Sequence, residues 1–267
     1  MSSQKSIDIP IYLVSLKQDV ARREKLKERF PETYSSFQHI EAVDGRLLPA
    51  KEYFEKTIGF YSYHKRVMTP AELGCALSHI QALTEFLNTS SSHAMIIEDD
   101  IIGKDKDFKY ISDFLSSEFK SDGIAYCGCQ DGLLLRYKYG KPIGNDVLKV
   151  VYSNRGEFSR AAAYIVSRKT AESILSFHNE QFITVADFWF DLLKEFKGNV
   201  YYLPVLSHPL DLGDSNIENE RLSVNRNIVQ KIFSRDVLLL IYRRVVKEIK
   251  RLWYKLQGHV QVKGING

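Results

Sequence analysis

Apolar and polar positions alternate along the chain in a way that is typical of an α/β protein. Residues 9–16 form a nearly continuous apolar run of strand length, and residues 20–30 follow a charged amphipathic pattern that predicts a helix. Residues 37–43 alternate as a second strand and stop at a turn. This order predicts a βαβ unit. Because ligands gather at the carboxyl ends of strands in such sheets, we expect them near Ser15 and Asp44.

The strongest local signal for a helix begins at Thr69. A threonine N-cap, Pro70 at the first helical position and Glu72 at the third together form a capping box, so we predict a helix over residues 70–87. Its apolar positions mark one buried face, and Gly74 permits close packing against that helix.

The remaining segments continue the alternation of strands and helices. Further strands are predicted at residues 124–129, 133–139, 147–152, 161–167 and 200–204. Helices are predicted at residues 51–58, 107–119 and 169–177, and residues 60–66 are interpreted as a loop.

An abrupt change from apolar to acidic residues marks the centre of the chain. Residues 95–97 have the pattern of a buried strand, and Glu98, Asp99 and Asp100 follow without a break. Three adjacent carboxylates repel one another, so the arrangement is costly unless a cation neutralises it. Oxygen ligands at a strand end suit Mg²⁺ or Mn²⁺ holding a diphosphate. The alternative is a solvated acidic turn.

Two isolated residues are further candidates for chemistry. His208 follows a late strand and is a candidate metal ligand, although a structural histidine explains it as well. Asp187 lies in a strongly apolar, aromatic segment, where desolvation would raise its pKa and suit it to act as a general base. The alternative is that Asp187 is the N-cap of a following helix.

Polar residues on two predicted helices have both a functional and a structural interpretation. Arg22 follows the first strand and could meet a phosphate or belong to a solvated helix face. Ser78 and His79 suggest a helix packed close to a ligand, with a core histidine as the alternative. The chain has no G-x-G-x-x-G sequence, Walker loop or nucleophile elbow, which argues against nicotinamide enzymes, ATPases and serine hydrolases.

Charge is unevenly distributed along the 267 residues, whose net charge is +4. Residues 226–255 carry nine basic and two acidic side chains, a net charge of +7, and the rest of the chain therefore carries −3. From residue 229 onward apolar residues recur at helical spacing among these cations. This pattern predicts a basic amphipathic helix on an anionic membrane surface, with docking on its own domain as the alternative. No nucleic-acid module accompanies the cations.

These observations predict two parts, a domain of residues 1–222 and a basic helical tail of residues 223–267. The three cysteines, Cys75, Cys127 and Cys129, are too few for a disulfide framework, and Cys127 and Cys129 are interpreted as buried thiols. The low cysteine content leads us to expect a cytoplasmic protein. No signal peptide or spanning helix is evident in the sequence.

Several stretches, in this order, resemble glycosyltransferase family 25, which includes bacterial lipooligosaccharide galactosyltransferases and collagen-modifying enzymes. The resemblance rests on residues 11–16 with Arg22 and Arg23, residues 42–45, 69–79, 97–100 and 162–167, and the acid Asp187. Residues 214–217 resemble a late Ser-Asp-Ile element, but Asn216 stands where the family pattern has Asp.

The resemblance implies a GT-A-like α/β domain with a central mixed sheet. It implies the transfer of a hexose from a UDP-sugar to a saccharide hydroxyl with inversion, with galactose favoured over glucose. The acceptor would be a lipid-linked oligosaccharide in lipooligosaccharide or lipopolysaccharide biosynthesis. A protein of this kind with a basic tail would be peripheral on the inner face of the inner membrane. The rival functions are a nucleotidyltransferase, which releases pyrophosphate, and an inactive membrane-associated binding protein.

Site residues follow from the same resemblance. Asp100 is the expected ligand of Mn²⁺ or Mg²⁺, together with Glu98, and Asp187 is the expected base. His208 is the additional metal-ligand candidate from its place after the late strand. The donor is expected to contact the following residues: Ser15, Leu16, Arg22, Asp44, Gly45, Ser78, His79, Glu98 and Asp99.

Overall fold

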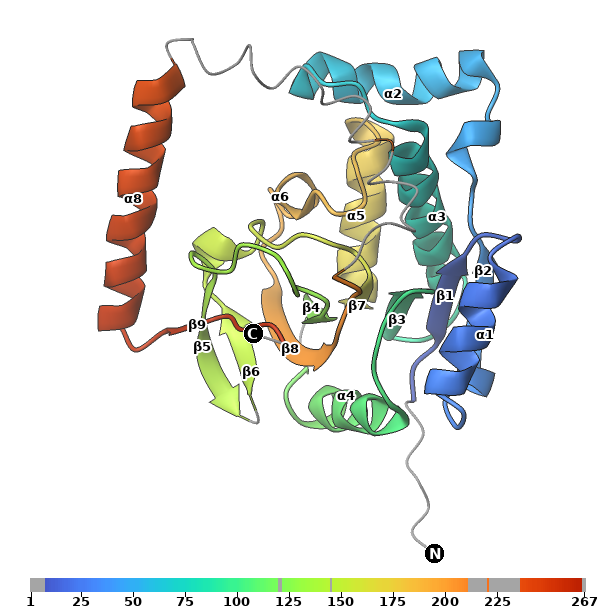
Figure 1. Cartoon of the computed structure of the whole chain (residues 1–267), viewed down its shortest axis with the longest axis horizontal. Coiled ribbons are helices and arrows are strands. Elements are labelled where there is room, and N and C mark those ends of the chain that lie inside the picture. Colours follow the sequence, from blue (N-terminus) through green and yellow to red (C-terminus); the bar gives the residue numbers. More distant parts are fainter. Residues whose placement is uncertain (1–7, 120–121, 145, 211–219, 221–235, 266–267) are drawn as a thin grey trace, which may run out of the picture.

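A central mixed sheet carries helices on both faces in the computed structural model, which describes residues 8–119, 122–144, 146–210, 220 and 236–265 (Figure 1). The strands are β1 (Ile11–Ser15), β2 (Phe37–Glu41), β3 (His93–Glu98), β4 (Gly123–Gly128), β5 (Tyr139–Gly144), β6 (Val147–Val150), β7 (Ala163–Ser167), β8 (Asn199–Leu206) and β9 (Val260–Gln261). The helices are α1 (Val20–Arg29), α2 (Ala50–His64), α3 (Pro70–Leu87), α4 (Asp105–Ser117), α5 (Arg168–Glu180), α6 (Trp189–Leu192) and α8 (Asp236–Leu256), with short 3₁₀ turns η1 (Tyr34–Ser36), η2 (Gly45–Leu47) and η3 (Tyr152–Asn154).

The strand order across the sheet is β2-β1-β3-β7-β4-β8-β6-β5-β9. β1 pairs in parallel with β2 on one side and β3 on the other, whereas β7 is antiparallel to both β3 and β4. The chain thus leaves β1 toward β2 and later returns to the opposite side of β1. This reversal creates the crevice at the carboxyl ends of β1 and β3 in which open α/β sheets bind ligands. The predicted α/β class with a central mixed sheet is confirmed.

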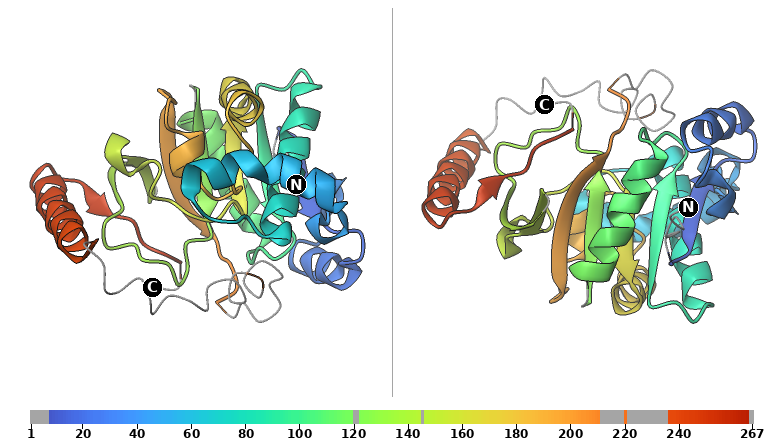
Figure 2. Two further views of the ribbon diagram at one scale, coloured as in Figure 1. Left: turned by 90° about the horizontal axis from the view of Figure 1, so that it is seen from above. Right: turned by 90° about the horizontal axis from the view of Figure 1, so that it is seen from below.

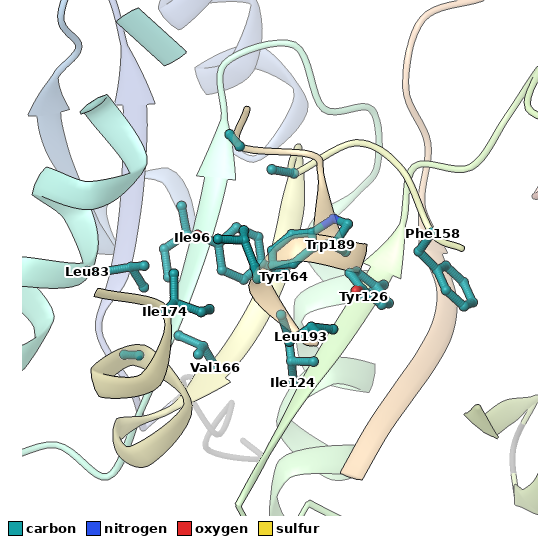
Figure 3. Packing of buried hydrophobic residues seen from close by; sticks show 14 of the residues in the cluster. Leu83, Ile96, Ile124, Tyr126, Phe158, Tyr164, Val166, Ile174, Trp189 and Leu193 are labelled. Carbon is teal, nitrogen blue, oxygen red and sulfur yellow. The ribbon is translucent and has the colours of Figure 1, made fainter. Parts of the chain in front are cut away.

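Helices cover both faces of the sheet (Figure 2). The two faces bury separate sets of apolar side chains. Along β1, Tyr12 and Val14 pack with α3, α5 and α6, and Ile11 and Leu13 pack with α1 and α4, because successive side chains of a strand point to opposite faces. On the first face Trp189 of α6 packs edge-on against the ring of Tyr164, with ring centres 5.1 Å apart (Figure 3). This contact fixes the segment that contains Asp187 against the sheet.

Helix α3 begins with the predicted capping box. Thr69 Oγ1 accepts a hydrogen bond from the Glu72 backbone N–H at 3.2 Å, and Glu72 Oε2 accepts one from the Thr69 N–H at 2.9 Å. Glu72 is fully buried and also accepts two hydrogen bonds from the Arg66 guanidinium, at 2.8 and 3.1 Å. The start of α3 is therefore held at a fixed place beside the crevice.

Three expectations about local structure are wrong. Residues 133–139 form turns rather than a strand, which begins only at Tyr139, because the chain reverses at Gly132 with a φ of +71°. Residues 60–66 are largely helical: α2 continues to His64 because Phe60 is fully buried against Phe182 and Phe188. Asp187 is not a helix N-cap, since Phe188 occupies that position before α6.

The predicted tail helix is present as α8, which lies at the far edge of the sheet beside β9 and β5, apart from the helices on the sheet faces (Figure 1). No helix within the described ranges is long and apolar enough to cross a membrane. The late element at residues 214–217 lies outside the described residues, and the division into residues 1–222 and 223–267 stays a prediction.

Candidate active site

A cavity of about 340 Å³ opens at the carboxyl ends of β1 and β3. The predicted site residues gather around it from β1, α1, η2, α3, β3 and the segments near Asp187 and His208. Its lining includes Ser15, Leu16, Arg22, Asp44, Gly45, Ser78, Glu98, Asp99, Asp100, Asp187 and His208. Of the predicted site residues only His79 stands back from the lining, behind Glu98.

Arg22 neutralises two carboxylates of the acidic triplet. Its Nε lies 2.9 Å from Asp99 Oδ1 and its Nη2 lies 2.8 Å from Asp100 Oδ2. Ser15 Oγ donates a 2.6 Å hydrogen bond to the second oxygen of Asp99. Burial nevertheless raises the pKa of Asp99 to about 6, against the opposing effects of Arg22 and Ser15. Asp99 is thus buried, Asp100 is partly buried, and both are paired with Arg22, so the solvated-turn interpretation does not hold for these two residues.

Asp100 and His208 meet at 3.3 Å, measured from Asp100 Oδ2 to His208 Nε2. Burial acts to raise the pKa of Asp100, but the hydrogen bond and charge of His208, with Arg22, hold it below its usual value. Asp100 Oδ1 is buried and has no hydrogen-bond partner in another described residue. A buried carboxylate oxygen without a partner, next to an imidazole, is a donor set that fits Mn²⁺ or Mg²⁺.

Glu98 faces a different set of partners. Its Oε1 lies 3.1 Å from His79 Nε2, and His79 Nδ1 lies 3.1 Å from the hydroxyl of Tyr164. The ligand atoms of Cys75, His79 and Glu98 lie within 4.8 Å of one another, so this group could also hold a cation. The three predicted metal ligands therefore fall into two groups, Asp100 with His208 and Glu98 with His79. The metal site stays a prediction.

Residues at the η2 side of the cavity hold its wall in place. Asp44 accepts hydrogen bonds from Arg46 Nε and Nη2, both at 2.7 Å, and these bonds lower the pKa of Asp44. Ser78 Oγ accepts from the Val43 N–H at 2.8 Å. A Cβ at Gly45 would lie 1.9 Å from the carbonyl oxygen of Pro70, so only glycine fits there. The small residues of α3 thus bring this helix close to the η2 backbone.

The cavity also contains cations that the sequence did not single out. Lys25, Arg29, Arg46 and Arg160 line it together with Arg22. Arg160 has a positive φ of 63° and donates to the carbonyl oxygens of Cys129 and Asp131. The sequence could have indicated Arg46 as a cavity residue, because it lies two residues from Asp44 in the same turn. No sequence signal indicated Arg160, since only the folded sheet brings it to this edge.

These features define an α/β protein with a highly charged binding cavity at the switch point of its sheet. The chain belongs to glycosyltransferase family 25, because the family model described as "Glycosyltransferase family 25 (LPS biosynthesis protein)" matches residues 8–189. This match confirms the resemblance drawn from the ordered motifs.

Individual relatives match this chain over a shorter stretch than the family model does. A "Glycosyltransferase 25 family member" of Drosophila melanogaster is 35% identical over 96 residues, and "Procollagen galactosyltransferase 1-B" of Xenopus laevis is 31% identical over 96 residues. Each match covers 34% of this chain and only 16% of the relative's length. Among solved structures, a glycosyltransferase involved in the glycosylation of the major capsid of PBCV-1 is 13% identical, with a TM-score of 0.41 over 81% of this chain and 99% of that chain.

Proposed function

We propose that the protein transfers a hexose from a UDP-sugar to a saccharide hydroxyl with inversion at the anomeric carbon, and that the hexose is galactose rather than glucose. The observation that carries this proposal is the cavity, which joins the acidic triplet of the family motif to Arg22, His208 and Asp187. Membership of the family and the galactosyltransferases among its relatives support the choice of sugar.

The charges of the cavity suit a nucleoside diphosphate. Arg22, Arg46 and Arg160 place three positive charges on the wall of the cavity, and such charges attract phosphate oxygens. Ser15 and Leu16 at the end of β1 lie where the nucleotide would meet the sheet. Asp100 and His208 would hold Mn²⁺ or Mg²⁺, whereas Glu98 faces His79 and belongs to the second candidate group. Such an ion, when bound, stabilises the negative charge of the leaving diphosphate.

Asp187 is the proposed general base. It lines the same cavity, next to the buried Val185 and Ala186, and is placed there by the packing of Trp189 against the sheet. A carboxylate at this wall would accept the proton of the acceptor hydroxyl as its oxygen attacks the anomeric carbon. Inversion requires one displacement, so no covalent bond between sugar and protein is needed.

The acceptor is proposed to be a lipid-linked oligosaccharide in lipopolysaccharide or lipooligosaccharide biosynthesis of a bacterium. The description of the family model supports this choice. The protein would then work in the cytoplasm, at the inner face of the inner membrane.

The test is the release of UDP from a panel of UDP-hexoses with Mn²⁺, with and without a chelator. We expect release from one donor that the chelator suppresses. Asp187→Asn should lower kcat by about 10² to 10⁴ and leave UDP binding unchanged. Asp113→Asn, at an exposed position of α4, is the matched control. Turnover of Asp187→Asn near that of the wild type would refute the base, and release of pyrophosphate from a nucleotide would identify a nucleotidyltransferase instead.

A further inference from the structure

Helix α8 docks on the rest of the protein through its polar face. Glu248 accepts a 2.8 Å hydrogen bond from the Tyr137 hydroxyl and pairs with Arg136 at 2.7 Å. Lys247 pairs with Glu157 at 3.2 Å, and Tyr254 packs its ring against Tyr139 with centres 5.7 Å apart. An amphipathic helix of a globular protein ordinarily turns its apolar face inward. In α8 this orientation is reversed.

The apolar residues that the structure describes on this face of α8 consequently point to solvent. Residues three or four apart lie on one side of a helix, and the apolar residues of α8 follow this spacing. The exposed stripe consists of Tyr242, Val245, Ile249, Leu252, Trp253 and Leu256, with exposed fractions from 50% to 82%. Scattered exposed leucines are ordinary, but a continuous stripe along about four turns indicates a binding surface.

Cations accompany the stripe. The sequence of α8 contains six basic and two acidic residues, a net charge of +4. Arg244, Lys250 and Lys255 are exposed. A second copy of the same helix would bring these like charges together, whereas a surface of anionic headgroups complements them. The apolar stripe and the flanking cations together fit a bilayer interface better than another copy of this chain.

We propose that the exposed stripe of α8 binds the surface of an anionic membrane, with the helix lying in the plane of the headgroups. Because no described helix could span a bilayer, the contact is interfacial.

The attachment of α8 to the sheet makes this contact directional. The chain after α8 forms β9, which pairs with β5, and the following Val262 is fully buried. The hydroxyl of Tyr202 in β8 donates a 2.7 Å hydrogen bond to the carbonyl oxygen of Lys263. A helix fixed at its carboxyl end in this way would hold the catalytic domain in one orientation on the membrane, rather than tether it loosely.

Sedimentation of the full chain with lipid vesicles tests the proposal. We expect binding to vesicles of phosphatidylcholine with about 30% phosphatidylglycerol, and at least tenfold weaker binding to phosphatidylcholine alone or at high salt. Ile249→Glu and Leu252→Glu should each weaken binding at least tenfold. Ile58→Glu places the same charge at a 60% exposed isoleucine on α2, away from α8, and should have no effect.

Tryptophan fluorescence provides a second readout on the same samples. The chain has two tryptophans, of which Trp189 is buried and Trp253 is 58% exposed on the stripe. Anionic vesicles should shift the emission to shorter wavelength, and Trp253→Phe should abolish the shift while retaining binding.

Three results would overturn the proposal: absence of binding, equal binding to neutral vesicles, or a dimer in solution that Leu252→Glu dissociates. UDP release without vesicles should be the same in Leu252→Glu and wild type, so a failure here is separate from a failure of the proposed activity.

Discussion

Replacing Arg22 by methionine would remove the cation that neutralises two carboxylates in the cavity. Opposite charges about 4 Å apart are worth about 4 kcal/mol at an effective dielectric constant of 20, and Arg22 contacts both Asp99 and Asp100. The cost of desolvating Arg22 offsets part of this attraction, and its side chain is 34% exposed. We therefore expect Arg22→Met to lower the free energy of unfolding by about 2 to 4 kcal/mol at neutral pH.

The loss should depend on pH in a defined direction. Burial raises the pKa of Asp99 to about 6, and removal of Arg22 would raise it further, because Arg22 favours the ionised form. Below this pKa Asp99 is protonated and needs no cation, so the difference between variant and wild type should be smaller at about pH 5 and grow toward about pH 8. The measurement is urea unfolding of both proteins at several pH values.

A divalent cation should partly replace Arg22. Saturating Mn²⁺ should stabilise Arg22→Met more than the wild type, because two unneutralised carboxylates bind a cation more tightly. Lys25→Met is the matched control. Lys25 lies on the same helix as Arg22 and lines the same cavity, but it has no carboxylate partner among the described residues. Equal losses in both variants, or a loss independent of pH and Mn²⁺, would show that Arg22 does not neutralise the triplet.

Two further predictions concern stability. Gly45→Ala should lower the free energy of unfolding by about 3 kcal/mol, because its Cβ would meet the Pro70 carbonyl oxygen at 1.9 Å. Gly258→Ala, at a positive φ in open space, should lower it by about 1 kcal/mol. Similar losses for the two variants in urea unfolding would refute the close contact at Gly45. Burial lowers the pKa of His178 to about 4 from its ordinary value of 6.5, so stability should be full above about pH 6.5 and fall by about 3 kcal/mol toward about pH 4. His178→Gln should flatten this part of the pH profile, and an unchanged slope would contradict the assignment.

The sheet could be predicted where local patterns and tertiary packing agree. The apolar run of β1 and the capping box of α3 specify their elements without help from the rest of the chain. The prediction failed at residues 60–66, because the polar tyrosines there gave no sign that Phe60 would be buried against Phe182 and Phe188. It also failed at residues 133–139, whose apolar residues suggested a strand although the turn at Gly132 prevents pairing.

The site was predictable where the motif is continuous in sequence. Glu98, Asp99 and Asp100 stand together in the chain, and their position at the end of β3 follows from the pattern alone. Their partners come from distant elements, as the contacts of Asp99 with Ser15 and of Asp100 with His208 show. Glu98 faces His79 rather than Arg22, because neighbouring residues at a strand end point in different directions. The sequence does not record such directions.

The most direct test of the central claim is calorimetric titration of UDP into the protein with Mn²⁺ present. We predict binding with a Kd on the order of 10 µM, weakened at least tenfold by Asp100→Asn or by a chelator and unchanged by Asp113→Asn. Absence of UDP binding would contradict the assignment of the cavity to a nucleotide-sugar donor. Binding that Asp100→Asn leaves unchanged would show that the acidic triplet does not hold the metal and diphosphate.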